Sequence, residues 1–483
     1  MASVSKFEAV SNFSWRYIGK LGSQIISFTV TVILARLIAP EAFGAVAIVT
    51  IFTSLLQVFV DSGLGSALIQ KKNVDDVDFS SVFYFNIFIC FVLYWVLYLC
   101  SPLIADFYNN QKLTELLRVT SLSLIIVGLR NTQETYVARN LLFKKHFVAT
   151  TVSITISAII GVIMAYSGFG AWAIVGLQLS NTGISTLLLW YIIPWRPNRS
   201  FSLERLKGLL TFGVKVLGAN IADTLYSEMR SLLIGKVYSA KDLAYYDRGK
   251  QFPYLIVSGV NGALNSIMLP VLSREQDDVC KIKYIVRRII RITLFFISSI
   301  LAFLICSAES IIATLMTEKW LPCVLYLQIL CFDTLLWPII AAHYNSYQAV
   351  GKSDVYMKIV LITKALGIIL LVLVIKWSVI YVAISSVLAM VFQLFIVAFI
   401  SKKCNKYGYS EQVSDIVSGV MPGFMITICI WWVNYLNIDY CWKFTAQVLI
   451  TIITFIGYSK LSKAEGYELL EELIKAKIKS KHE

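Results

Sequence analysis

The sequence predicts an all-α polytopic membrane protein with about fourteen transmembrane helices. Of its 483 residues, 58% are hydrophobic and 15% are charged, whereas an ordinary soluble protein has about 25% charged residues. Apolar runs of about 20 residues, the length that crosses a bilayer core, recur along the whole chain. These runs are continuous, unlike the short alternating segments of a transmembrane β-barrel.

The expected spans follow one another with short loops between them. Lys and Arg gather on one set of alternate loops, so the positive-inside rule places both termini in the cytoplasm and favours an even number of spans. The same basic loops meet anionic lipid and account for the net charge of +14, so we expect no nucleic-acid partner. The spans are expected at 16–38, 42–61, 79–102, 114–134, 147–166, 171–193, 209–235, 244–269, 285–306, 321–350, 355–375, 378–400, 414–434 and 441–460.

The second half of the chain echoes the first. Leu217–Asn220 (LGAN) repeats Leu21–Gln24 (LGSQ), and in both Arg36–Gly44 and Lys236–Ala244 a basic residue closes a span before a short acidic turn. Repeats with an even number of spans are parallel and place a substrate site in the crevice between them. We therefore expect two pseudo-symmetric six-helix lobes around a central cavity. The expected divisions are an N-terminal lobe at 1–193, a cytoplasmic linker at 194–207, a C-terminal lobe at 208–400, a terminal helix pair at 401–460 and a cytoplasmic tail at 461–483.

The sequence lacks the motifs of common enzymes and metal sites. There is no Walker, HExxH or GxSxG motif, and there are only three histidines. The nine cysteines are scattered without a CxxC pair, so we expect no disulfide framework, metal cluster or cofactor. The N-terminus does not resemble a cleaved signal peptide and is expected to lie along the membrane interface. A membrane glycan polymerase or ligase needs none of these motifs and stays an alternative, although such enzymes usually carry a large outer loop.

The span at 209–235 carries more charge than a helix surrounded by lipid tolerates. One charge at the bilayer centre costs about 2.5–3.5 kcal/mol on insertion scales. At 100° per residue most of its polar side chains share one face, while Glu228 lies roughly opposite and is expected to serve structure. That face either lines a cavity for a charged head group or an ion, or pairs with another helix. Its members, which are candidates for substrate binding, are Lys215, Asn220, Asp223, Tyr226 and Arg230, with Ser227 beside them.

Further candidates lie in other spans. In the first span, Lys20 and Gln24 are expected to meet an anionic head group, although basic residues at a cytoplasmic helix end are also routine topology signals. The fourth and tenth spans hold amides and aromatics that suit sugar hydroxyls, and that equally suit hydrogen bonds between helices. His343 in the tenth span is expected to be a satisfied buried histidine. The secondary candidates are Arg16, Arg36, Asp61, Arg130, Glu134, Arg139 and Asn345.

A series of short motifs carries a family resemblance over nearly the whole chain. The motifs are LARLIAP at 34–40 with Phe43-Gly44, DSGL at 61–64, ALIQKK at 67–72, Phe143-Lys144, LPVL at 269–272 and EKWLP at 318–322. In this order and spacing, the sequence resembles the Wzx-type polysaccharide flippases of the multidrug/oligosaccharidyl-lipid/polysaccharide exporter superfamily. The likeness is to the branch that exports exopolysaccharide repeat units.

The resemblance implies fourteen helices around a cavity that alternates between the two faces of the bacterial cytoplasmic membrane. It implies a substrate of one oligosaccharide unit on undecaprenyl diphosphate, destined for exopolysaccharide, capsule or O-antigen, with membrane lipid and a polysaccharide polymerase of the same pathway as partners. Family members have a cationic lumen, for which Lys20, Lys215 and Arg230 are the matching candidates. Some depend on an ion gradient, so we expect Asp223 to handle a proton or sodium ion. The alternative within the superfamily is a multidrug or cation exporter, whose site should be acidic and apolar.

Overall fold

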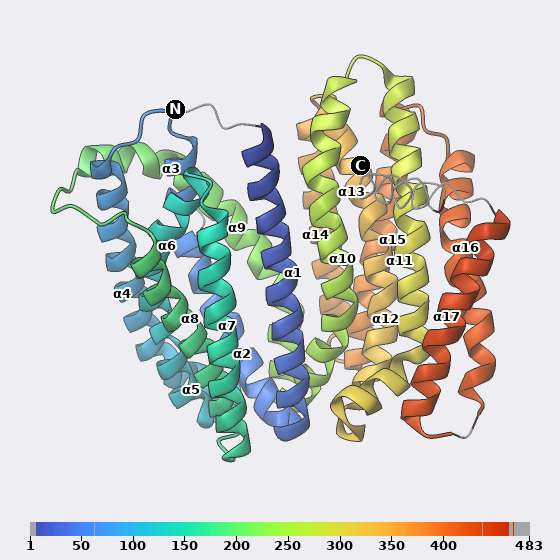
Figure 1. Cartoon of the computed structure of the whole chain (residues 1–483), viewed down its shortest axis with the longest axis horizontal. Helices are drawn as coiled ribbons and strands as arrows, with labels where there is room; N and C mark the ends of the chain where they lie inside the picture. Colours follow the sequence, from blue (N-terminus) through green and yellow to red (C-terminus); the bar gives the residue numbers. More distant parts are fainter. Residues whose placement is uncertain (1–5, 62, 437, 463–466, 468–483) are drawn as a thin grey trace, which may run out of the picture. The chain divides into compact units, whose positions relative to one another are not determined.

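The computed structural model describes residues 6–61, 63–436, 438–462 and 467. The side chains of residues 6–21, Asp61, Phe212 and Lys215 lie outside this description. Within the described ranges every element is a helix (Figure 1), which confirms the all-α prediction. The chain forms two compact units, Met1–Ala244 and Tyr245–Glu483, and each is described by itself.

Every expected span lies on a helix, and two of the spans are divided. The fourth consists of α5 and α6, which meet at Ser121, and the tenth consists of α12 and α13, which meet at Leu336. A short helix, α3, was not predicted. The elements are α1 (Lys6–Leu37), α2 (Pro40–Asp61), α3 (Leu64–Gln70), α4 (Asp76–Phe107), α5 (Lys112–Thr120), α6 (Leu122–Arg139), α7 (Phe143–Tyr166), α8 (Ala171–Ile192), α9 (Leu203–Val237), α10 (Ala240–Arg274), α11 (Val279–Met316), η1 (Glu318–Trp320), α12 (Cys323–Leu335), α13 (Trp337–Ala349), α14 (Ser353–Val374), α15 (Val379–Cys404), α16 (Tyr409–Asn434) and α17 (Tyr440–Ser462).

In the described part of the chain, 11 helices are long and apolar enough to cross a membrane, by length and composition. In this count α2 is joined to α3, and α12 to α13. The expected spans outside the count are α1, the short pair α5 and α6, and the charged helix α9. The chain is therefore a multi-pass membrane protein, and fourteen crossings stay a prediction.

The two divided spans break for chemical reasons that apolarity alone does not reveal. Pro338 stands in the first turn of α13, and proline lacks the amide hydrogen that would continue α12. At the other break, the hydroxyl of buried Ser121 donates a hydrogen bond to the Arg118 carbonyl at 2.8 Å. This local bond competes with the regular helical ladder.

In the N-terminal unit, α9 packs along α2 and also contacts α3 and α4 (Figure 1). Near its start, Gly213 meets Gly63 so closely that a Cβ on Gly63 would lie 2.8 Å from the Gly213 carbonyl oxygen. Near its end, the Tyr108 hydroxyl donates a hydrogen bond to the Leu232 carbonyl at 3.2 Å. The first compact unit thus extends past the linker expected at 194–207 and includes α9. The lobe boundaries themselves stay a prediction.

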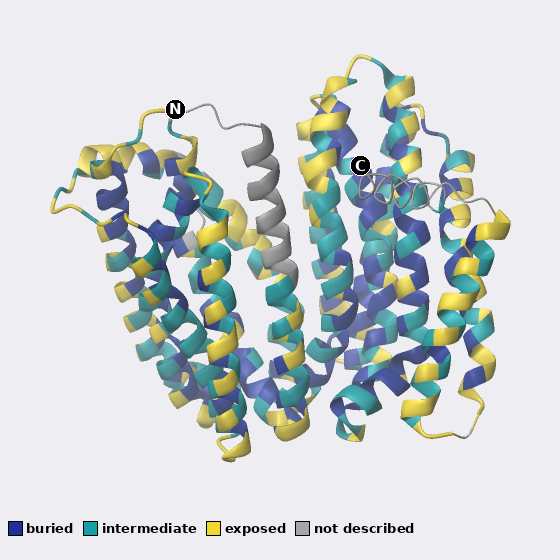
Figure 2. Ribbon diagram, viewed as in Figure 1, coloured by how far each residue is buried: buried dark blue, intermediate teal, exposed yellow. Residues whose placement is uncertain are grey.

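The second unit is built around α11, whose residues are buried along its length against α12, α13, α16 and α17. Gly423 lets α16 approach closely, since a Cβ there would lie 2.6 Å from the Ser298 carbonyl oxygen. In contrast, α17 is mostly exposed or half-buried (Figure 2), as expected for a helix that faces lipid.

The starts of α11 and α16 are joined by a group of charged residues, the α11–α16 cluster. The Arg287 guanidinium donates to both carboxylate oxygens of Asp415, at 2.7 and 3.1 Å, and to Glu411 at 3.0 Å. Lys283 lies 2.7 Å from Glu411, and the Tyr407 hydroxyl donates to Asp415 at 2.7 Å. Because Asp415 is buried, these partners replace the water that its charge loses.

Candidate functional site

A pocket of about 560 Å³ lies among α1, α6, α7 and α8 of the N-terminal unit. We call it the polar pocket, because most of its lining side chains carry hydrogen-bonding groups. Phe143 and Phe147 add aromatic surface to the lining. The polar lining residues are Ser23, Arg130, Glu134, His146, Thr150, Ser153, Asn181 and Ser185.

Three ionisable side chains form the charged wall of the polar pocket. Arg130 and Glu134 lie one turn apart on α6, with guanidinium Nε 3.1 Å from carboxylate Oε1. His146 of α7 brings its Nε2 to 3.6 Å from the same oxygen. Two basic groups from two helices therefore fix the Glu134 carboxylate in place while about a third of that side chain, 35%, stays exposed. A carboxylate held in this way accepts hydrogen bonds from hydroxyl groups.

Arg130 and Glu134 were predicted from the sequence, whereas the residues that α7 and α8 contribute to the pocket were not. His146, Thr150 and Asn181 join the site only because α7 and α8 pack closely together. One sequence signal points to this packing, since small residues at a four-residue spacing let helices approach in membranes. Those residues, all buried on α7, are Ala149, Ser153, Ser157, Gly161 and Ala165.

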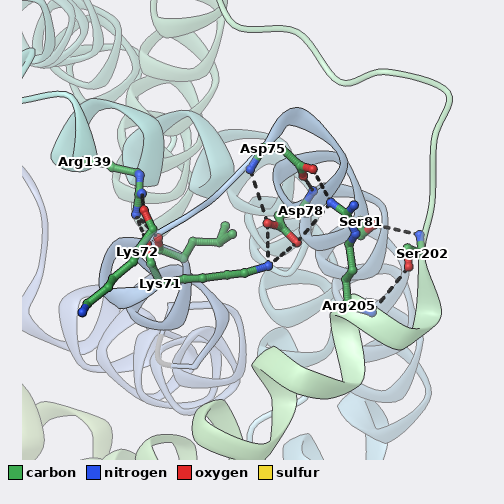
Figure 3. Close-up of polar contacts among 9 residues, drawn as sticks. Lys71, Lys72, Asp75, Asp78, Ser81, Arg139, Ser202 and Arg205 are labelled. Atoms are coloured by element: carbon green, nitrogen blue, oxygen red, sulfur yellow. Dashed lines mark hydrogen bonds and ion pairs between the residues drawn. The ribbon is translucent and has the colours of Figure 1, made fainter. Parts of the chain in front are cut away.

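A second polar group, the linker cluster, ties the start of α9 to the start of α4 and the end of α3 (Figure 3). Its members are Lys71, Asp75, Asp78, Ser81, Ser202 and Arg205. Asp78 is 1% exposed and accepts from Lys71 Nζ at 2.8 and 2.7 Å. Arg205 pairs with Asp75 and lies 3.9 Å from Asp78. The Ser202 amide donates to the Ser81 hydroxyl at 2.9 Å.

Asp75 also caps α4. Its carboxylate accepts from the Asp78 amide at 3.0 Å, and the Asp78 carboxylate accepts in return from the Asp75 amide at 3.3 Å. The hydrogen bond from Arg205 holds the pKa of Asp75 below its ordinary value of 3.8. The Asp75 carboxylate is therefore a charged partner for Arg205 at neutral pH.

Arg139, a secondary candidate for substrate binding, is engaged by main-chain carbonyls (Figure 3). It donates to those of Leu68, Ile69, Lys71 and Lys72 at 2.6, 3.1, 2.9 and 3.1 Å. These carbonyls lie at and just beyond the end of α3, where a helix leaves its acceptors without partners. Arg139 therefore holds this turn in place, and its role in substrate binding stays a prediction.

The structure describes only some of the candidate side chains in the first and seventh spans. On α9, Asn220 and Asp223 are exposed, while Tyr226 and Arg230 are half-buried. The Arg230 guanidinium lies over the Tyr226 ring, 5.7 Å from its centroid, in a cation–π arrangement. Gln24 is half-buried on α1. The side chains of Arg16, Lys20, Asp61 and Lys215 lie outside the described residues.

Two further candidates and one histidine have clear positions. Asn345 is buried and donates from Nδ2 to Asn265 Oδ1 at 2.7 Å, which joins α13 to α10. Arg36 is exposed in the last turn of α1. His343 is buried as expected, but its Nδ1 atom has no hydrogen-bond partner in the described part of the chain, so it is not the satisfied histidine that we expected.

The family of the chain follows from sequence comparison. A family model described as polysaccharide biosynthesis protein matches residues 33–325. The chain belongs to this family. The matched region includes α6, α7 and α8 of the polar pocket and the whole of the linker cluster.

Proteins similar to this chain come from several bacteria. Succinoglycan biosynthesis transport protein ExoT of Rhizobium meliloti is 25% identical over 55% of this chain, and the match spans about half, 54%, of its own length. Teichuronic acid biosynthesis protein TuaB of Bacillus subtilis is 23% identical over 73% of this chain and 74% of its own. Lipopolysaccharide biosynthesis protein WzxC of Escherichia coli is 22% identical over 68% and 67%.

Solved structures identify the fold of this family member. Lipid II flippase MurJ in its inward closed conformation matches with a TM-score of 0.73 at 19% identity, over 92% of this chain and 98% of that one. A multidrug resistance MATE family transporter of the MOP superfamily matches with a TM-score of 0.63 at 13% identity, over 81% and 96%. The chain therefore has the two-lobed fold of that superfamily, as the resemblance implied.

Proposed function

We propose that this chain flips oligosaccharide units linked to undecaprenyl diphosphate across the bacterial cytoplasmic membrane, by alternating access, for surface polysaccharide biosynthesis. One observation within the molecule carries the proposal: a polar pocket of about 560 Å³ lies among helices of a membrane protein. Hydrocarbon offers no partner to a hydroxyl, amide or charge. A pocket that gathers such groups between membrane helices therefore fits a polar cargo.

The lining of the polar pocket suits a sugar. Glu134 accepts hydrogen bonds from hydroxyl groups, Asn181 both donates and accepts, and Arg130 donates to ring and hydroxyl oxygens. Phe143 and Phe147 offer apolar surface to the carbon–hydrogen faces of a pyranose ring. The volume lies within the range of about 300–1,000 Å³ that is usual for small-molecule sites.

The diphosphate requires cations, because charge-assisted hydrogen bonds to phosphate oxygens are stronger than neutral ones. We assign this role to Lys20, Lys215 and Arg230, and we assign to Asp223 the handling of a coupling proton or sodium ion. Both termini then lie in the cytoplasm, where the lipid-linked glycan is loaded. A polysaccharide polymerase of the same pathway would receive the product on the outer side.

The names of the relatives favour this proposal over its alternatives. ExoT is named a transport protein and MurJ a lipid II flippase, which supports a transporter and not a glycan polymerase or ligase. The MATE transporter shares the fold alone. In the polar pocket, Arg130 sits beside Glu134 and offsets its charge, which is unsuitable for a site that selects organic cations.

Reconstitution tests the proposal directly. We expect purified protein in liposomes to make a fluorescent lipid-linked oligosaccharide of the producing strain accessible to an enzyme on the opposite side of the membrane. Arg130→Ala or Glu134→Gln should slow this flipping about tenfold or more, because loss of one charged hydrogen bond weakens an interaction by about 1.5–3 kcal/mol. Lys215→Ala and Arg230→Ala should do the same through the diphosphate.

Lys145→Ala is the matched control, because this exposed lysine precedes His146 and does not line the pocket. It should flip at the wild-type rate, and all variants should reach the membrane in equal amounts. Wild-type protein that leaves the lipid-linked oligosaccharide on its original side would overturn the proposed function. Normal flipping by both Arg130→Ala and Glu134→Gln would remove the polar pocket from the transport path.

A further inference from the structure

A second pocket, of about 620 Å³, lies in the N-terminal unit at the end opposite to the linker cluster (Figure 1). It is formed by the start of α2, the start of α5 and the turn between α7 and α8, and we call it the outer pocket. The side chains that matter for its chemistry are Glu41, Asn110, Lys112, Glu115, Phe169 and Trp172. We propose that it binds the neutral sugars of the glycan on the outer face of the membrane. This inference rests on the proposed function for the identity of the glycan.

The lining combines aromatic faces with hydrogen-bond acceptors. Trp172 is half-buried and Phe169 is 55% exposed, so both present ring surface to a ligand. Glu115 and the Asn110 side chain supply oxygen atoms that accept from sugar hydroxyls. Apolar surface with a few convergent polar groups is the usual composition of a small-molecule site.

The charged side chains of the outer pocket favour the glycan part of the proposed substrate over its diphosphate. Glu41 is paired with Lys241 at 3.1 Å. Glu115 has no ion-pair partner among the residues that the structure describes, and it lies one helical turn from Lys112. The lining holds two carboxylates against one cation, Lys112, and this balance disfavours a diphosphate, whereas a hydroxyl group gains a charge-assisted hydrogen bond from Glu115. The lining thus selects the glycan and leaves the lipid diphosphate outside.

The backbone holds this lining in place without a ligand. Phe169 sits between Gly168, with φ of 81°, and Gly170, with φ of 55°, backbone angles that favour glycine. The Phe169 amide donates to the Met164 carbonyl at 3.2 Å, and the Trp172 amide donates to the Phe169 carbonyl at 3.1 Å. A turn fixed in this way keeps an aromatic ring at the rim of the pocket, and a site arranged before binding loses less entropy when it binds.

Binding of a soluble glycan tests the inference without requiring transport. The probe is one oligosaccharide unit of the producing strain's polymer, free of lipid and phosphate and labelled at its reducing end. Its affinity for the purified full chain in nanodiscs is measured by fluorescence anisotropy. We expect Trp172→Ala and Glu115→Gln to weaken binding about tenfold or more, as loss of one charged hydrogen bond does. Tyr166→Ala, a 73% exposed aromatic on the same α7–α8 hairpin but outside the pocket, should bind like the wild type.

Inorganic diphosphate should leave the bound probe in place. Equal affinity of wild type, Trp172→Ala and Glu115→Gln, or displacement of the probe by inorganic diphosphate, would overturn the assignment. The same preparations are assayed for flipping in liposomes. Wild-type protein that binds the probe at the outer pocket but does not flip refutes the proposed function and supports this site. If the wild-type protein flips its substrate, and both substituted proteins bind the probe as tightly as the wild type, only the outer-pocket assignment is refuted.

Discussion

The linker cluster in the first unit and the α11–α16 cluster in the second both join helices through a buried aspartate, but they differ in how many hydrogen bonds that aspartate accepts. Each fastens the first turns of a long helix to a neighbouring helix through a buried aspartate. Asp415 accepts from two guanidinium nitrogens and a tyrosine hydroxyl, all within 3.1 Å. Among side chains, Asp78 accepts hydrogen bonds from Lys71 alone in the described part of the chain, and Arg205 lies 3.9 Å away. Several strong hydrogen bonds therefore hold Asp415 in the second unit, whereas Asp78 in the first unit depends mainly on Lys71.

This difference matters because the cost of removing a partner depends on what it leaves behind. A buried carboxylate without its cation is strongly destabilising, by about 3–5 kcal/mol, whereas an exposed ion pair contributes about 0–1 kcal/mol. The comparison thus predicts an order of effects on stability, and each of the two larger effects has a matched control variant in the chain.

The largest loss is expected for Arg287→Ala. This change removes three charge-assisted hydrogen bonds at once, two to Asp415 and one to Glu411, and leaves Arg291 at 3.8 Å as a more distant cation for Asp415. We therefore expect the free energy of unfolding to fall by about 3–5 kcal/mol. Denaturant unfolding of the purified protein in detergent measures it. Arg288→Ala removes the same charge from an exposed neighbour and should be nearly silent. Equal unfolding midpoints for the two variants would contradict the comparison.

An intermediate loss is expected for Lys71→Ala. Asp78 would keep its capping bond and the more distant Arg205, so we expect a loss of about 1–3 kcal/mol, that of a buried group deprived of one charged partner. Lys72→Ala is the control, because that side chain is exposed. Combining Lys71→Ala with Asp78→Asn should cost less than the sum of the two single changes. Strict additivity would show that the pair does not interact.

The smallest loss is expected for Asp75→Asn, since 52% of this carboxylate and 42% of Arg205 are exposed. Asparagine can still cap α4, so only the screened charge is lost, at most about 1 kcal/mol at pH 7. The pKa of Asp75 is lower in the folded chain than its ordinary value of 3.8, so the stabilisation is present above that pH and disappears as the pH falls through the folded pKa. Unfolding of both proteins at neutral and acid pH should show a small difference that vanishes in acid. A difference that grows in acid would contradict this sign.

Most of the helical framework could be predicted because apolar runs of bilayer length are a local property of the chain. The breaks at Ser121 and Leu336 could not, since apolarity continues across both. The short helix α3 was missed because seven residues are too few for a periodic pattern. In the site, Arg130 and Glu134 were found together because one helix carries both.

The remainder of the site depends on how helices pack, which a single sequence does not reveal. His146 and Asn181 line the polar pocket from α7 and α8, and only the packing of these helices in the folded chain brings them beside Arg130 and Glu134. Arg139 was indistinguishable from its neighbour Arg130 by residue type, yet it binds four carbonyls of a turn that lies about seventy positions earlier in the chain. Charge at a helix end thus marked both a residue that lines the pocket and a residue that holds a turn.

The division between the compact units falls between Ala244 and Tyr245, inside α10 and not in a loop. Pro253 follows on the same helix and leaves the Gly249 carbonyl without its helical donor. Gly249 itself packs closely against α12, since a Cβ there would lie 2.7 Å from the Tyr326 Cβ. The chain therefore crosses the division as continuous helix, and any bending of α10 is expected first at Pro253, which lies within the second unit.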